Sequence, residues 1–132
     1  MVEIPYTHRD LLTDEAEVLA SLATIMPDGS PQVTPVWFDF IDGRIRVNTA
    51  KGRVKEQNMS SRPRVAFLVI DPKNPYRYLQ VRGRVVDRIE DGALEHIHKL
   101  ADKYTGEREF RGYQREGRVM FVIEANSVSV RG

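Results

Sequence analysis

The residues best suited to chemistry form a group of cations in the middle of the chain. Between positions 44 and 64 there are seven Lys and Arg residues and a single acidic residue. Lys51, Arg53 and Lys55 alternate there, and Gly52 stands where a helix would begin. The first amides of a helix have no partner inside it and attract phosphate, and a guanidinium can bond two phosphate oxygens. This segment predicts a phosphate site, although its spacing also fits a solvated basic helix face.

Other chemical signatures are missing or scattered. The chain has no G-x-G-x-x-G motif, no P-loop and no cysteine, which excludes disulfides, thiolate metal sites and cysteine nucleophiles. The histidines are His8, His96 and His98. The last two are two residues apart on an expected helix and face different directions, which is wrong for a shared metal ion. We therefore expect surface or edge histidines and no metal site, and the serines lack the context of a catalytic nucleophile.

Several aromatic residues leave two interpretations open. Trp37 and Phe38 could stack on a ring system, but aromatic residues in strands more often belong to the core, and Tyr76 and Tyr78 are similarly ambiguous. Small barrels with basic faces and aromatic residues also bind single-stranded nucleic acid. The chain carries 20 basic and 19 acidic residues, and this balance weakens the nucleic-acid alternative.

Alternating apolar and polar residues dominate the rest of the chain. The patterns predict strands at 18–26, 32–40, 44–49, 64–70, 76–88, 118–124 and 127–131. Tight turns are expected at 27–30 and 42–43, short helices at 7–12 and 52–61, and an amphipathic helix at 91–104. Short connections between strands favour a mainly β barrel with added helices over a βαβ fold.

Length and hydropathy limit the remaining possibilities. The 132 residues fit one domain, 1–132. No stretch approaches the roughly 18 consecutive apolar residues of a membrane span, and the first residues do not resemble a signal peptide. We therefore expect a cytoplasmic protein without a membrane partner.

Four segments follow one another in a distinctive order: 22–38 (LATIMPDGSPQVTPVWF), 47–58 (VNTAKGRVKEQN), 62–66 (RPRVA) and 74–83 (NPYRYLQVRG). Together they resemble the pyridoxamine 5′-phosphate oxidase-like split-barrel superfamily, and most closely its F420-dependent (deazaflavin) branch. The resemblance implies a split β-barrel, that is, a six- to eight-stranded antiparallel Greek-key barrel with two to three short helices. It also implies a homodimer with two equivalent coenzyme sites at the subunit interface.

The resemblance also assigns coenzyme-binding residues. The family's phosphate-contacting strand end and helix start match Asn48, Thr49, Arg53 and Lys55, with Ala50, Lys51 and Gly52 between them. The strand beside the ring of the coenzyme matches Thr34, Pro35, Val36 and Trp37, and a polar position on the long strand matches Tyr78. The C-terminal Trp and Arg elements of true pyridoxamine phosphate oxidases are missing, so vitamin B6 oxidation is not implied.

The implied activity is that of an F420-dependent oxidoreductase. Such an enzyme transfers a hydride from the reduced coenzyme to a small unsaturated or conjugated substrate, while the protein binds and orients both. An FMN-binding oxidoreductase or flavin carrier of the same fold is the alternative. The proton could come from solvent or from one of three tyrosines, Tyr78, Tyr104 or Tyr113.

Overall fold

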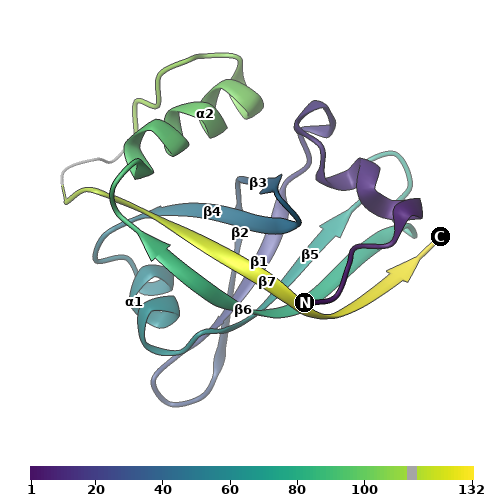
Figure 1. Cartoon of the computed structure of the whole chain (residues 1–132), viewed down its shortest axis with the longest axis horizontal. Helices are drawn as coiled ribbons and strands as arrows, with labels where there is room; N and C mark the ends of the chain where they lie inside the picture. The colour runs from purple at the N-terminus through teal and green to yellow at the C-terminus, as the bar shows by residue number, and fades with distance from the viewer. Residues whose placement is uncertain (113–115) are drawn as a thin grey trace.

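The structure is a computed structural model that describes residues 1–112 and 116–132. Its centre is one antiparallel sheet with the strand order β2-β1-β5-β6-β7-β4-β3. The seven strands of the described residues are β1 Ala20–Ile25, β2 Pro31–Val36, β3 Phe38–Ile41, β4 Arg44–Ala50, β5 Arg64–Ile70, β6 Tyr78–Ile89 and β7 Arg118–Arg131. Figure 1 shows that the sheet curls round on itself, and the buried side chains of its strands form one hydrophobic core. This arrangement confirms the predicted split β-barrel.

The curl of the sheet explains one wrong prediction. The expected single strand at 32–40 is two strands, β2 and β3, separated by Trp37. β2 pairs with β1 at one edge of the sheet, whereas β3 pairs with β4 at the other edge. The chain therefore crosses the open seam of the barrel at Trp37. A run of β-branched and aromatic residues contains no local sign that its pairing partner changes.

Alternating burial along the strands builds the core. On β5, Val65, Phe67 and Val69 are buried, and the residues between them are more exposed. The Phe67 ring packs edge to face on Phe38 of β3, with 5.0 Å between ring centroids. Because β3 and β5 are not neighbours in the sheet, this contact shows that the curled sheet closes on one shared core.

A close approach between β6 and β7 bends these two long strands. A Cβ atom on Gly83 would lie 2.2 Å from the backbone oxygen of Glu124, so the site accepts only glycine without a shift of the backbone. The pairing passes from Gly83 with Ala125 to Arg82 with Ser127, which leaves one extra residue on β7. The predicted strands at 118–124 and 127–131 are therefore a single bulged strand.

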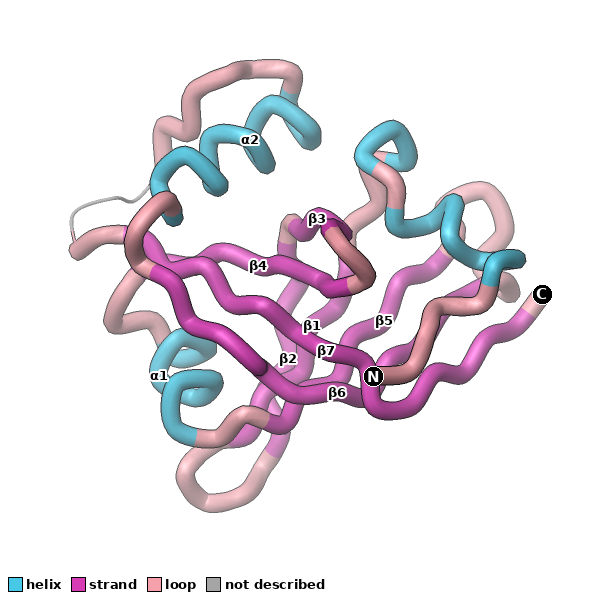
Figure 2. The backbone as a smooth tube through the Cα atoms, in the orientation of Figure 1, coloured by secondary structure: helices cyan, strands magenta, loops and turns pink. Residues whose placement is uncertain are grey.

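Two α-helices and two 3₁₀ helices among the described residues complete the fold: η1 Tyr6–Leu12, η2 Asp14–Ala16, α1 Val54–Ser61 and α2 Ala93–Thr105. α1 packs against β1 and β4, and α2 packs against β4 and β7. Figure 2 shows the two α-helices on opposite sides of β4. No helix in the described part of the chain is long and apolar enough to cross a membrane.

The expectation of surface histidines is wrong for two of the three. His8 and His96 are 2% and 5% exposed. His8 donates from Nε2 to the carbonyl oxygen of Arg131 at 2.8 Å and contacts the Thr7 hydroxyl through Nδ1. Both rings can be buried because each of their nitrogens has a hydrogen-bond partner.

Candidate coenzyme site

A cleft of about 310 Å³ lies where β4, the β2–β3 crossing, β7 and the start of α1 meet. Seven of the predicted site residues line it: Pro35, Val36, Trp37, Asn48, Thr49, Arg53 and Lys55. Leu19, Phe110 and Arg118 complete the wall and were not predicted. The structure thus brings the predicted ring strand and the predicted phosphate segment to one place.

The other predicted phosphate-segment residues flank this cleft. Lys51 and Gly52 line a shallow depression next to it, together with Arg53. Ala50 is the last residue of β4 and is fully buried. The ammonium of Lys51 forms an ion pair with Glu90, so its charge already has a partner inside the chain.

Thr34 and Tyr78 do not line the cleft. Thr34 precedes the cleft residues on β2, and its hydroxyl is buried without a hydrogen-bond partner among the described residues. Tyr78 starts β6 and pairs with Arg131 at the end of β7, whereas the cleft lies near the start of β7. Within one chain Tyr78 therefore stays apart from the other predicted residues.

Three cations gather in the cleft: Arg53, Lys55 and Arg118. Burial lowers the pKa of Lys55, and repulsion from the two arginines lowers it further. Burial and the charge of Arg53 lower the pKa of Arg118 to about 10. Among the described residues, no carboxylate pairs with Arg53 or Lys55. A bound anion would relieve this repulsion, which makes the cleft a candidate anion site.

The start of α1 adds backbone donors to these cations. Arg53 precedes the first residue of the helix, Val54, and supplies no side-chain cap. The Gly52 N–H donates to the Glu56 carboxylate at 3.0 Å, while the amides of the first helical turn have no acceptor inside the helix. Gly52 has a φ of +88°, so its left-handed conformation turns the chain from β4 into the helix.

An aromatic wall stands beside the cations. Trp37 stacks on Tyr104 of α2, with ring centroids 5.4 Å apart and planes 7° from parallel. Phe110 meets Trp37 edge to face at 6.1 Å, and the Arg118 guanidinium lies 4.9 Å from the Phe110 ring centroid. Trp37 therefore belongs to the cleft wall rather than to the interior of the barrel. A cleft with an aromatic wall and a cationic end fits a planar ring that carries a phosphate.

Two of the three tyrosines considered as proton donors can be placed. The Tyr104 hydroxyl donates to the carbonyl oxygen of Val18 at 2.7 Å, and burial raises its pKa well above the usual range. Tyr104 thus keeps its proton and supports Trp37. Tyr78 lies away from the cleft, and Tyr113 lies outside the described residues.

A buried carboxylate, Asp39, links the strands and the helix that surround the cleft. Asp39 is fully buried and accepts two hydrogen bonds from Arg46, at 2.8 and 2.7 Å, and one from Lys99 at 2.8 Å. Burial opposes its charge, but hydrogen bonds from Arg46, His96 and Lys99 outweigh burial and hold the pKa of Asp39 below its usual range. These contacts fix α2 to β3 and β4. Sequence reasoning missed this group because its members come from separate elements.

Comparisons with known proteins agree with this fold. The family model described as pyridoxamine 5′-phosphate oxidase matches residues 6–132. A solved structure named F420 reductase is 37% identical, with a TM-score of 0.84, and the match covers 96% of this chain and 98% of that chain. A conserved hypothetical protein from Mycobacterium tuberculosis is 26% identical, with a TM-score of 0.75 and coverage of 98% and 86%.

More distant matches show the fold alone. The HupZ protein of Group A Streptococcus is 16% identical, with a TM-score of 0.69 and coverage of 96% and 93%. The search of the curated proteins finds no match.

Proposed function

Because this chain belongs to the pyridoxamine 5′-phosphate oxidase family, we propose that it is an F420-dependent reductase. The observation that carries the proposal is the meeting of Arg53, Lys55 and Arg118 beside the Trp37 wall. When bound, reduced F420 supplies a hydride for a small unsaturated or conjugated substrate. The chain itself binds the phosphate through the cations and orients the ring against the Trp37 wall.

Each part of the cleft has a separate task in this proposal. Arg53 and Lys55 have no acidic partner among the described residues, so they can neutralise a phosphate without breaking an ion pair. The amides at the start of α1 add hydrogen bonds to the same group. The Trp37 ring is held flat against Tyr104 and offers a rigid wall to the deazaflavin or to the substrate beside it. No side chain is assigned as acid or base, and solvent supplies the proton.

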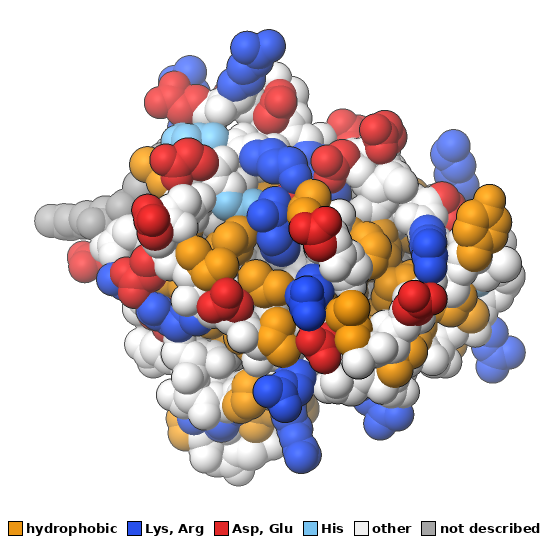
Figure 3. Space-filling model, in the orientation of Figure 1, with side chains coloured by type: hydrophobic (Ala, Val, Ile, Leu, Met, Phe, Trp, Pro, Cys, Tyr) orange, Lys and Arg blue, Asp and Glu red, His pale blue; other side chains and the backbone are white. Residues whose placement is uncertain are grey.

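F420 is preferred to FMN on similarity. The structure named F420 reductase matches this chain at 37% identity over nearly its full length. An FMN-binding oxidoreductase or flavin carrier remains the second candidate, because the same cations would hold the phosphate of FMN. A nucleic-acid-binding barrel has less support, since Figure 3 shows cationic and acidic side chains interspersed over the visible face.

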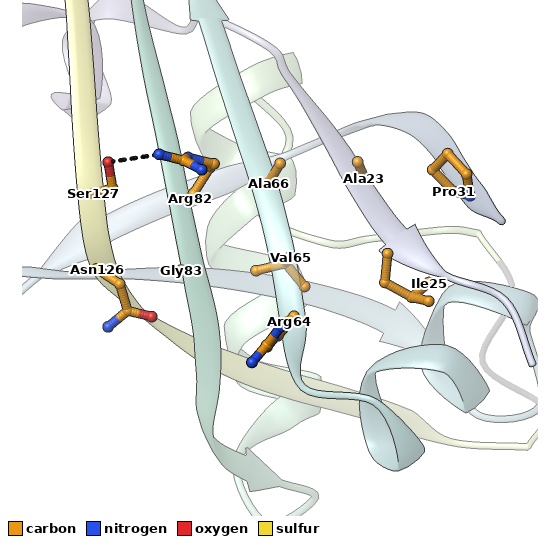
Figure 4. A pocket seen from close by; sticks show the side chains of 10 residues that line it. All are labelled: Ala23, Ile25, Pro31, Arg64, Val65, Ala66, Arg82, Gly83, Asn126 and Ser127. Carbon is orange, nitrogen blue, oxygen red and sulfur yellow. Dashed lines mark hydrogen bonds between the residues drawn. The ribbon is translucent and has the colours of Figure 1, made fainter. Parts of the chain in front are cut away.

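We also propose that the chain acts as a homodimer whose partner helps to wall the cleft. A groove of about 560 Å³ runs over β1, β5 and β6. It is lined by small residues such as Ala23 and Ala66 and also by the cations Arg64 and Arg82 (Figure 4). Val33 of the neighbouring β2 is 64% exposed. Leu19 and Pro35 line the coenzyme cleft next to these strands. In this proposal a second copy seated on this face extends along β1 and β2 to the edge of the coenzyme cleft at Leu19 and Pro35.

The activity can be tested directly with chemically reduced F420 and a panel of conjugated enones and related electron-poor alkenes. We expect the purified protein to speed the oxidation of reduced F420 by at least one member of the panel. The same panel with reduced FMN is the control. Acceleration with FMN alone would contradict the F420 assignment and favour the second candidate.

A further inference from the structure

A line of hydrogen bonds joins the buried Asp39 to the coenzyme cleft. His96 of α2 places Nε2 at 3.3 Å from Asp39 Oδ1 and Nδ1 at 3.0 Å from Asn48 Nδ2. The Asn48 oxygen accepts a hydrogen bond from Arg118 Nε at 2.9 Å. His96 and Asn48 thus bridge a fully buried carboxylate and a cation that lines the cleft.

The two ends of this line fix the direction of each hydrogen bond. Asp39 is ionised and only accepts, so His96 donates from Nε2. Nδ1 faces the Asn48 amide nitrogen, which also donates to Ala93, so Nδ1 accepts with its lone pair and the ring carries its proton on Nε2. Arg118 only donates, so the Asn48 oxygen must face it. Both ends require the same orientation of the Asn48 amide.

Asn48 has no amide hydrogen to spare for a ligand. Its nitrogen donates to His96 and also to the Ala93 carbonyl oxygen at 2.8 Å. A direct bond from this nitrogen to a phosphate would break one of the two contacts. The resemblance places Asn48 at the phosphate-contacting strand end, and its side-chain contacts imply that the side chain acts on a phosphate indirectly, through Arg118.

We propose that His96 is a positioning residue for the coenzyme: it holds Asn48 so that Asn48 orients the Arg118 guanidinium toward the phosphate. The inference rests on the proposed function, which makes the phosphate of F420 the anion in the cleft. His96 does not touch the coenzyme. A positioning role requires Nδ1 of His96 to accept the hydrogen bond from Asn48, whereas a packing role requires only the volume of the side chain. Variants that keep one nitrogen contact and lose the other therefore distinguish the two roles.

Two substitutions distinguish the ring nitrogens. His96→Asn puts an amide oxygen near the position of Nδ1, where it can accept from Asn48, and gives up the contact with Asp39. His96→Gln puts its amide near the position of Nε2, where it can donate to Asp39, and gives up the contact with Asn48. We expect His96→Gln to raise the F420 dissociation constant about 10-fold, the effect of a disturbed charged hydrogen bond. His96→Asn should stay within about threefold of the unmodified protein.

Fluorescence titration gives the affinities, and thermal unfolding of the same samples reports stability. A purely structural role predicts that affinity follows the unfolding temperature in both variants, and that result would overturn the proposal. In an Arg118→Ala background, His96→Gln should change the dissociation constant by less than about twofold, because the residue it positions is gone. A full 10-fold loss in that background would also overturn it. If the unmodified protein binds no F420, the proposed function fails and the positioning role fails with it; binding that His96→Gln leaves unchanged contradicts the positioning role alone.

Discussion

Replacing Arg53 and Lys55 together by alanine should weaken F420 binding by about 100-fold or more. Each side chain lines the cleft, and neither has a carboxylate partner among the described residues. Loss of one charged hydrogen bond costs about 1 to 3 kcal/mol, so each single variant should weaken binding by about 5- to 150-fold. On the proposed function both side chains contact one phosphate, so we expect the double variant to lose less than the sum of the two single losses.

Fluorescence titration of F420 measures this loss, and Lys73→Ala is the control. Lys73 is an exposed cation in the loop after β5 and lies outside the cleft. Its replacement by alanine changes the net charge by the same amount as each single variant. We expect unchanged affinity for this control. Lys51→Ala should fall between the control and the single variants, because Lys51 already pairs with Glu90. Unchanged affinity in the double variant would show that the phosphate of F420 does not bind in this cleft.

Asp39→Ala should destabilise the fold by about 3 kcal/mol, since it leaves the buried His96 and the partly exposed Arg46 and Lys99 without their carboxylate. The Asp39 side chain is fully buried, whereas Arg46 keeps 23% exposure and Lys99 keeps 42%. This partial access to water places the expected loss at the low end of the range for broken buried ion pairs. The control is Asp14→Ala, because Asp14 also pairs with Lys99 but is 48% exposed, and its loss should cost less than about 1 kcal/mol.

The effect of Asp39 should depend on pH. Hydrogen bonds hold the pKa of this carboxyl below its usual range in the folded protein. Its stabilisation is therefore complete above the unfolded-state pKa of about 4 and is lost as the pH falls toward the folded-state pKa. Urea unfolding should show a larger gap between the unmodified protein and Asp39→Ala at about pH 7 than at about pH 3. A gap that is the same at both pH values would show that Asp39 contributes by packing rather than by charge.

Local patterns predicted most of the strands but not where they pair. The long strand β6 was located from its alternation of apolar and polar residues, and β5 was located as a compact apolar run. The break at Trp37 escaped prediction because it depends on closure of the barrel, which brings β2 and β3 to opposite edges of one sheet. The bulge opposite Gly83 was misinterpreted as a gap between strands, because two short alternating runs look the same in either case.

The part of the candidate site that comes from one continuous segment of the sequence could be predicted. Asn48, Thr49, Arg53 and Lys55 occupy a strand end and a helix start, and the structure places all four in one cleft. Their role in coenzyme binding stays a prediction. The cation at Arg118 was missed, since only the pairing of β4 with β7 brings it beside this segment.

The buried hydrogen-bond network around Asp39 could not be predicted from the spacing of residues in the sequence. Asp39 lies on β3, its partner Arg46 on β4, and His96 and Lys99 on α2. Isolated histidines and charged residues usually lie at the surface, and the general pattern was applied to His96. Its burial depends on partners at both ring nitrogens, which come from strands far away in the sequence.

The central claim is that this cleft binds F420 through its phosphate, and a side-by-side titration of the purified protein with F420 and FMN tests it most directly. We predict that F420 binds with micromolar or better affinity, more tightly than FMN, and that binding weakens as salt is added. A yellow protein that retains FMN through purification and shows no affinity for F420 would contradict the claim.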